Sequence, residues 1–289
     1  MTAEPTYNKH LASLTAIFVL GDAVIVLPSS NSGDYPLLGF FIGAAAAVLL
    51  YFSALSLTGF IGKKYTSVLG LLAAAYAFYS AGISFIRCID FANKILLPET
   101  SRFLIAALFI VCAVYLATRK QEVILKLSLI VLFSAIIAII TFFLLSAKDF
   151  NIKNILVYDF PTLSGVINSA KPYLINIALP AVLIPVYSAL FIGKKRICAT
   201  FSGIVTGLAL ILVCLLESLL LFGTAFAEKL QFPLAAAVST VTVGQLFTRM
   251  DGIVYCLFFV TALIKSAVCI KLAFAVLSRG RCPHRPAKK

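Results

Sequence analysis

LASLTAIFVLGDAVIVLP, residues 11–28, is the stretch that decides the fold. It is apolar enough to cross a bilayer as a helix, yet it carries Gly21 and Asp22 at its centre and ends at Pro28. An ionisable side chain near the middle of a bilayer costs at least about 2.5–3.5 kcal/mol, so it usually faces a cavity, a partner or a substrate. Glycine leaves helical geometry more readily than any other residue. We therefore interpret this stretch as an interrupted helix that forms half of a binding site.

The composition places the rest of the chain in a membrane as well. Of the 289 residues, 62% are hydrophobic and only 12% are charged, whereas a soluble domain carries about 25% charged residues. The formal charge of +13 comes from short basic clusters between apolar runs, which argues against a nucleic-acid partner. Two histidines, one near each end, and seven scattered cysteines form no metal-binding pattern, so we expect neither a metal nor a cofactor.

Taking about 20 residues as one crossing, we interpret eight apolar runs as transmembrane spans. They cover residues 11–28, 36–60, 67–96, 103–118, 123–146, 172–192, 199–225 and 252–277. Basic residues such as Lys63, Lys64, Lys194 and Lys195 lie in alternate connections and in the tail 278–289, so the positive-inside rule places both termini in the cytoplasm. We interpret the weaker run in 226–250 as an interfacial or partly re-entrant helix. The pattern predicts one all-α polytopic membrane domain over residues 1–289.

The third span carries a polar stripe. Its members recur at steps of three and four and therefore share one face of the helix: Tyr76, Ser80, Ser84, Arg87, Asp90 and Lys94. Arg87 with Asp90, or Asp90 with Lys94, can pair along this face. The stripe predicts either the lining of an outer vestibule or gate, or a structural ion pair that holds the helix against its neighbours.

The sixth span, residues 172–192, contains Pro180 and Pro185 in its interior. Each proline removes a backbone donor and clashes with the preceding turn, so we expect a kink or a break there. Interrupted spans at positions one and six indicate two inverted five-helix repeats with the substrate site at the two breaks. The first repeat would cover residues 11–146 and the second residues 172–277, with Asn176 and Pro180 near the second break.

Two further charges lie inside apolar spans, Glu217 in the seventh and Lys265 near the centre of the eighth. Both are candidates for ion or proton coupling. The ammonium group of Lys265 would then bridge the first and eighth helices at a place where other transporters bind a cation. The alternative is a permanent ion pair of Lys265 with Asp22 or Glu217.

Several local motifs point to one family. They are GDAVIVLP at 21–28, LLPET at 96–100, Glu122 followed by Lys126, and FP at 232–233 leading to GQLFTRMD at 244–251. With these motifs the chain resembles, over nearly its whole length, the AB-type permease subunits of spore germinant receptors. These belong to the amino acid, polyamine and organocation (APC) transporter superfamily.

The resemblance implies a leucine-transporter-like fold with discontinuous first and sixth helices. It places Gly21, Asp22 and the adjacent Ala23 on the unwound part of the first helix, where they would contact a small amino-acid-like solute. Tyr76 and Ser80 on the stripe would add to this contact. The family usually has about ten spans, so the second repeat of this chain, with three helices, would lack two.

The function implied is transport or germinant sensing in the cytoplasmic or spore inner membrane. A soluble-domain membrane subunit and a lipoprotein are the partners that the family implies. A receptor subunit that does not transport, or an ion channel lined by the third span, are the alternatives. We do not expect an enzyme or catalytic residues, because no H-E-x-x-H, G-x-S-x-G or paired-aspartate signature occurs.

Overall fold

The computed structural model describes residues 4–26, 35–60, 68–155, 162–191, 196–240 and 251–280. Within these ranges the chain is helical and has no strand. Several parts of the sequence interpretation lie outside them: residues 27–28 of the first stretch, the basic pairs Lys63, Lys64 and Lys194, Lys195, residues 241–250 of the predicted re-entrant run, and 281–289 of the basic tail.

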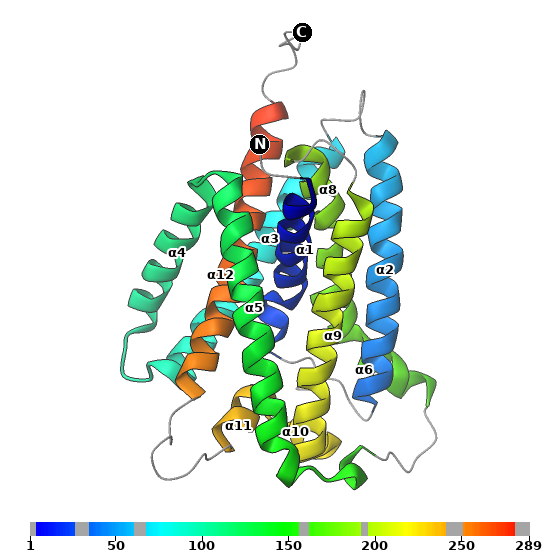
Figure 1. Cartoon of the computed structure of the whole chain (residues 1–289), viewed down its shortest axis with the longest axis vertical. Helices are drawn as coiled ribbons and strands as arrows, with labels where there is room; N and C mark the ends of the chain where they lie inside the picture. Colours follow the sequence, from blue (N-terminus) through cyan, green and yellow to red (C-terminus); the bar gives the residue numbers. More distant parts are fainter. Residues whose placement is uncertain are drawn as a thin grey trace.

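The helices follow the order of the apolar runs (Figure 1). In the first half they are α1 (Glu4–Leu20) with η1 (Gly21–Ala23), α2 (Pro36–Phe60), α3 (Val68–Phe91) with η3 (Ala92–Leu96), α4 (Arg102–Thr118) and α5 (Gln121–Ser146). Two short turns follow, η4 (Ala147–Asp149) and η5 (Ile152–Asn154). The second half contains α6 (Leu163–Tyr173), η6 (Leu174–Ala178), α7 (Leu179–Ala181), α8 (Leu183–Phe191), α9 (Ile197–Phe222), α10 (Thr224–Ala227), α11 (Pro233–Thr240) and α12 (Asp251–Gly280).

Six helical segments in the described ranges are long and apolar enough to cross a membrane. They contain α2, α3, α5, the consecutive segments α6 to α8, α9 and α12. The other two expected spans correspond to α1 and α4, which have 17 residues each. An all-α polytopic membrane protein is thereby confirmed. The count of eight spans and the pair of inverted repeats remain predictions.

The sixth span begins earlier than the sequence suggested. The apolar run starts at Pro172, but α6 already begins at Leu163, where the Thr162 side chain caps the helix by accepting a hydrogen bond from the Gly165 amide at 3.3 Å. The first turns of α6 are too polar to count as a span on hydropathy alone. The helix start was therefore predicted wrongly, by about two and a half turns of about 3.6 residues each.

The central helix of the bundle is α1 (Figure 1). It packs against α5, α9 and α12, and between Leu11 and Ile25 only Ala12 is more than marginally exposed. The contrast with α4 at the edge is clear, because Phe103 and Val111 on that helix are 84% and 65% exposed. The stretch that carries Asp22 therefore contacts protein on all sides, which is where a polar group in a membrane span is tolerated.

Two glycines on α9 bring this helix close to α1. A Cβ on Gly203 would overlap the carbonyl oxygen of Ala12 and lie 2.7 Å from Cβ of Thr15. A Cβ on Gly207, one turn further, would lie 2.9 Å from the carbonyl oxygen of Ala16. Small residues four positions apart commonly permit such close packing between membrane helices. This contact fixes α1 against α9 in the turns that precede the break at Gly21.

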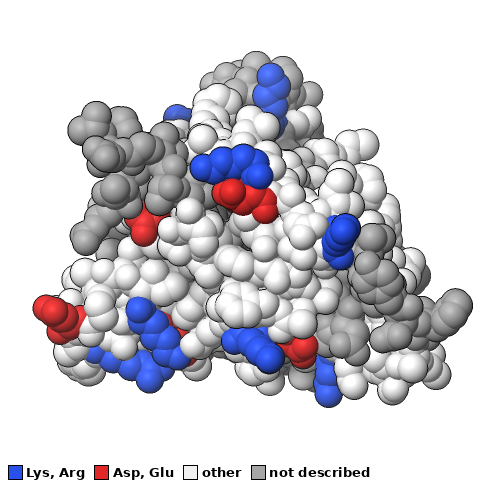
Figure 2. Space-filling view, turned by 90° about the horizontal axis from the view of Figure 1, so that it is seen from below, with Lys and Arg blue, Asp and Glu red and all other residues white. Residues whose placement is uncertain are grey.

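The beginning of α1 and the end of α12 lie at the same end of the bundle, the upper one in Figure 1. The lower end carries the short helices α10 and α11. Seen from that end, cationic and anionic side chains lie interspersed instead of forming a patch of one sign (Figure 2). Among the described residues, an ion pair between Arg102 and Asp90 joins the start of α4 to the end of α3.

Candidate functional site

The first helix breaks at Gly21. Regular α-helix ends at Leu20, Gly21 adopts a positive φ of +23°, and a single 3-10 turn follows. The Gly21 carbonyl accepts a hydrogen bond of 3.1 Å from Oγ1 of Thr261 on α12. A Cβ on Gly21 would overlap Cδ of Lys265. Glycine is thus required here both for the backbone conformation and to let the Lys265 side chain pass.

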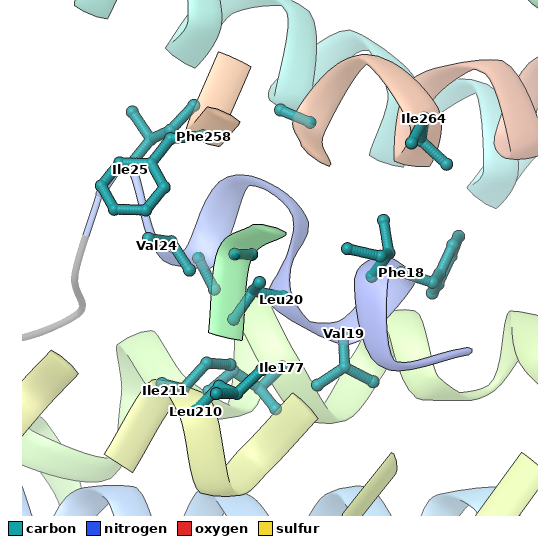
Figure 3. Packing of buried hydrophobic residues seen from close by; sticks show 14 of the residues in the cluster. Phe18, Val19, Leu20, Val24, Ile25, Ile177, Leu210, Ile211, Phe258 and Ile264 are labelled. Carbon is teal, nitrogen blue, oxygen red and sulfur yellow. The ribbon is translucent and has the colours of Figure 1, made fainter. Parts of the chain in front are cut away.

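Apolar packing holds the break in place on both sides (Figure 3). Leu20 lies beside Ile177 of η6 and near Ile211 of α9, while Ile25 lies against Phe258 of α12. All five of these residues are at most 1% exposed. Tight packing around a broken helix leaves its polar groups with fixed partners, as expected where irregular backbone is buried in a membrane protein.

Asp22 holds two cations at the break. The carboxylate is 2% exposed, and its Oδ1 forms an ion pair with Lys265 of α12. Its Oδ2 accepts a bond of 2.6 Å from Nη1 of Arg87 on α3. The other terminal nitrogen of Arg87, Nη2, donates to Oδ1 of Asn176 in η6 at 2.6 Å. One polar network therefore joins η1, α3, α12 and η6.

The second break brings Asn176 to this network. The helix that begins as α6 widens to a π-helix over Leu174–Ala178 before α7 and α8 continue. Pro180 has no amide hydrogen to donate to the carbonyl of Asn176, four residues earlier, so the regular α-helical pattern fails at this point. Single π-helical turns often occur at functional sites. The irregular segment ends two residues before Pro180.

A small pocket lies between the two breaks. It is lined by Asp22, Tyr76, Tyr79, Ser80, Ile83, Arg87, Ile175, Asn176, Pro180 and Lys265. Its volume of about 10 Å³ is at the lower limit of roughly 10–15 Å³ that a single water molecule needs. The side chains that line the pocket therefore nearly fill it in this structure.

Apolar groups pack on both sides of the pocket. Toward the lower end of the bundle, the ring of Phe91 packs edge-on against Phe232 and Tyr255, with centroid distances of 5.4 and 5.6 Å. The Tyr255 hydroxyl donates to the carbonyl of Ala235 in α11 at 2.8 Å. Toward the upper end, a second, almost entirely apolar cavity of about 20 Å³ lies between α1, α8, α9 and α12. Phe18 lines that cavity, and its ring also faces the ammonium group of Lys265.

Most of the site residues proposed from the sequence meet at this pocket. Those that line it are Asp22, Tyr76, Ser80, Arg87, Asn176, Pro180 and Lys265. Gly21 and Ala23 form the break without lining the pocket. Asp90 and Glu217 lie elsewhere.

The pairing predicted along the third span is wrong. Arg87 turns inward to Asp22 instead of pairing with Asp90. Asp90 pairs with Arg102 at the start of α4, and Lys94 donates to Oε1 of Gln231 at 2.6 Å. A pair along one helix contributes only about 0.2–0.5 kcal/mol, so a buried carboxylate on a neighbouring helix is the stronger partner for Arg87.

Glu217 does not join the charged network. Its carboxyl group is buried, and Ser146 donates a hydrogen bond of 3.0 Å to Oε1. No Lys or Arg in the described ranges lies within 4.0 Å of it. The sequence left Asp22 and Glu217 open as partners of Lys265, and the structure pairs Lys265 with Asp22.

Replacing Glu217 by Gln is expected to lower the free energy of unfolding by at most about 1 kcal/mol. The amide keeps an acceptor for Ser146 and leaves no cation without its partner. Thermal unfolding of the purified variant in detergent measures this. A loss of about 3–5 kcal/mol, as large as that caused by an unpaired buried charge, would contradict the conclusion that Glu217 lies outside the charged network.

Two polar residues of the site were missed. Thr261 bonds to the carbonyl at the break, and Tyr79 lines the pocket. Thr261 precedes Lys265 by four positions and so lies on the same face of α12, a spacing that was sufficient to find it. Tyr79 follows Tyr76 by three positions and therefore lies on the same face of α3, so the same spacing rule was sufficient to find it.

A family model described as a spore germination protein matches residues 8–279. The chain belongs to the spore germination protein family. The match begins in α1 and ends in α12, so it includes both breaks and every residue that lines the pocket. No curated protein sequence matches this spore germination protein. The membership supports the resemblance to germinant-receptor permeases and is consistent with the APC superfamily.

Proposed function

We propose that this spore germination protein binds a small amino-acid-like solute in the pocket between η1 and η6, for transport or for germinant sensing. The observation that carries the proposal is the network of Asp22, Lys265, Arg87 and Asn176 at two helix breaks. Buried charges cost several kcal/mol each to remove from water, so intramembrane ionisable groups commonly mark a substrate or ion pathway. Discontinuous helices are where such proteins expose backbone and side-chain partners to a solute.

Binding requires the site to open, because about 10 Å³ is too small for an amino acid. The polar groups of the solute would replace contacts that the protein now makes within itself. The first of these is the hydrogen bond between Arg87 and Asn176. Such an exchange changes how α3 and η6 are held together. A ligand that makes better contacts in the rearranged state then shifts the population toward it.

Transport and sensing share this binding step and differ in the conformational step after it. Transport requires the pocket to open alternately toward both sides of the membrane, whereas a receptor subunit needs only to bias a partner. The description of the family as spore germination proteins favours sensing. The partners proposed for this role are a membrane subunit with a soluble domain and a lipoprotein.

Binding and uptake measured on the same preparation separate the two roles. Purified protein in proteoliposomes is incubated with radiolabelled amino acids, first to saturation for binding and then with a trapped interior volume for uptake. Uptake that depends on the protein indicates a transporter, and binding without uptake indicates a receptor subunit. Folded protein that binds none of the twenty common amino acids contradicts the proposed function.

A further inference from the structure

The pocket carries one more positive than negative charge. Arg87 and Lys265 are its two cations, Asp22 is its single anion, and the remaining lining residues are uncharged. Two other acids that the sequence proposed for the site are engaged elsewhere in the described structure, because Asp90 pairs with Arg102 and Glu217 bonds to Ser146. An arginine side chain stays protonated in proteins. An anion from outside would balance the site.

Asp22 is not free to bind the ammonium group of a solute. Each of its carboxylate oxygens already meets one cation, Oδ1 with Lys265 and Oδ2 with Arg87. The side chain is also 2% exposed. Its contacts therefore do not favour a role for this carboxylate in binding an amine.

Arg87 is the cation that a solute can reach. Its side chain is 22% exposed, against 2% for Lys265. Its second terminal nitrogen donates to a neutral acceptor, the amide oxygen of Asn176. A carboxylate binds a guanidinium group more strongly than an amide does, because the bonds are charge-assisted and two of them can form in parallel. Three residues with hydroxyl groups, which can donate further hydrogen bonds, line the same pocket: Tyr76, Tyr79 and Ser80.

We infer that the pocket selects its ligand by a carboxylate that displaces Asn176 from Arg87, so that acids without an amino group are accepted and amines without a carboxylate are rejected. This inference rests on the proposed function and names the chemical group that the site recognises. The incoming negative charge balances the surplus positive charge. The pair of Asp22 and Lys265 remains in place throughout.

A matched set of ligands tests this on the unaltered protein. Thermal unfolding in detergent identifies the amino acids that stabilise the folded state, since a ligand that binds only that state raises the melting temperature. For each hit, the deaminated acid, the decarboxylated amine and the amino-acid amide are then compared; for alanine these are propionate, ethylamine and alaninamide. We expect the acid to raise the melting temperature, and the amine and amide to leave it unchanged.

Three other outcomes are distinguishable. If the amine or the amide stabilises the protein and the deaminated acid does not, the carboxylate inference is overturned while the proposed function stands. The same holds if only compounds that carry both groups bind. If no amino acid and no acid stabilises the folded protein, the proposed function fails and the inference fails with it.

The variant Asn176→Asp tests the charge balance in the protein itself. It places a carboxylate of the same shape against Nη2 of Arg87 and so supplies the anion internally. We expect a higher melting temperature together with roughly 10-fold to 100-fold weaker binding of the acid, because the ligand must now displace a charged partner. Misfolding cannot produce this combination.

The matched control is Asn8→Asp. The amide oxygen of Asn8 also accepts a bond from an arginine, Arg196, but on an exposed part of α1 far along the helix from the break. This variant is expected to bind the acid like the unaltered protein. Unchanged acid binding by Asn176→Asp, or a lowered melting temperature, would overturn the inference.

Discussion

The variant Asp22→Asn is expected to lose about 3–5 kcal/mol of stability, because removing one partner of a buried ion pair leaves an uncompensated charge behind. In this protein it leaves two, since both Lys265 and Arg87 bond to the same carboxylate. Neither cation has another acidic side chain within 4.0 Å in the described ranges. Thermal or denaturant unfolding of the purified variant measures the loss.

Asp90→Asn is the matched control for this variant. It makes the same chemical change in an ion pair with Arg102, in which the side chains of Asp90 and Arg102 are 28% and 63% exposed. Exposed pairs contribute about 0–1 kcal/mol, so a small loss is expected. Adding Lys265→Met to Asp22→Asn should restore part of the stability, because one of the two unpaired cations is then gone. Equal losses for Asp22→Asn and Asp90→Asn would contradict the buried network.

Gly203→Ala is expected to destabilise the bundle by about 1–3 kcal/mol through overpacking. The added methyl group would overlap a backbone oxygen of α1, that of Ala12, and the backbone cannot turn aside as a long side chain can. Gly203→Val should be worse. Because this contact positions α1 before the break, binding at the pocket should weaken as well.

Gly82→Ala on α3 is the control for the glycine variant. A Cβ there meets no atom within 4 Å, and alanine is favoured over glycine in a helix by about 1 kcal/mol. Its melting temperature should equal or exceed that of the unaltered protein. A similar loss in both variants would indicate a general helix effect and would remove the special role of the contact between α1 and α9.

The interruption of the first helix was predictable because its signal is local. Gly21 and Asp22 stand out within an apolar run, and no neighbouring helix is needed to see this. The prolines of the sixth span gave a similar local signal, and the irregular turn lies close to them. Lys265 was correctly identified as a possible partner of Asp22, since both were charges in the middle of apolar spans.

The pairing of Arg87 was not predictable from periodicity. Helical spacing places Arg87 and Asp90 on one face of α3, but it does not say how that face is rotated relative to α1. The rotation follows from packing of α3 against α12, far apart in the sequence. The start of α6 was missed for a different reason, since polar residues such as Ser169 and Lys171 hide a membrane helix from a count of apolar residues.

Photoaffinity labelling tests most directly whether a solute binds at the two breaks. A diazirine analogue of the most stabilising amino acid is irradiated with the purified protein, and the labelled peptides are identified by mass spectrometry. We predict labelling in the segments that contain Asp22, Tyr79 or Asn176, which meet at the pocket, and its suppression by the unlabelled amino acid. Labelling that the unlabelled ligand suppresses only in other segments, such as α4 or α5, would contradict a binding site between η1 and η6.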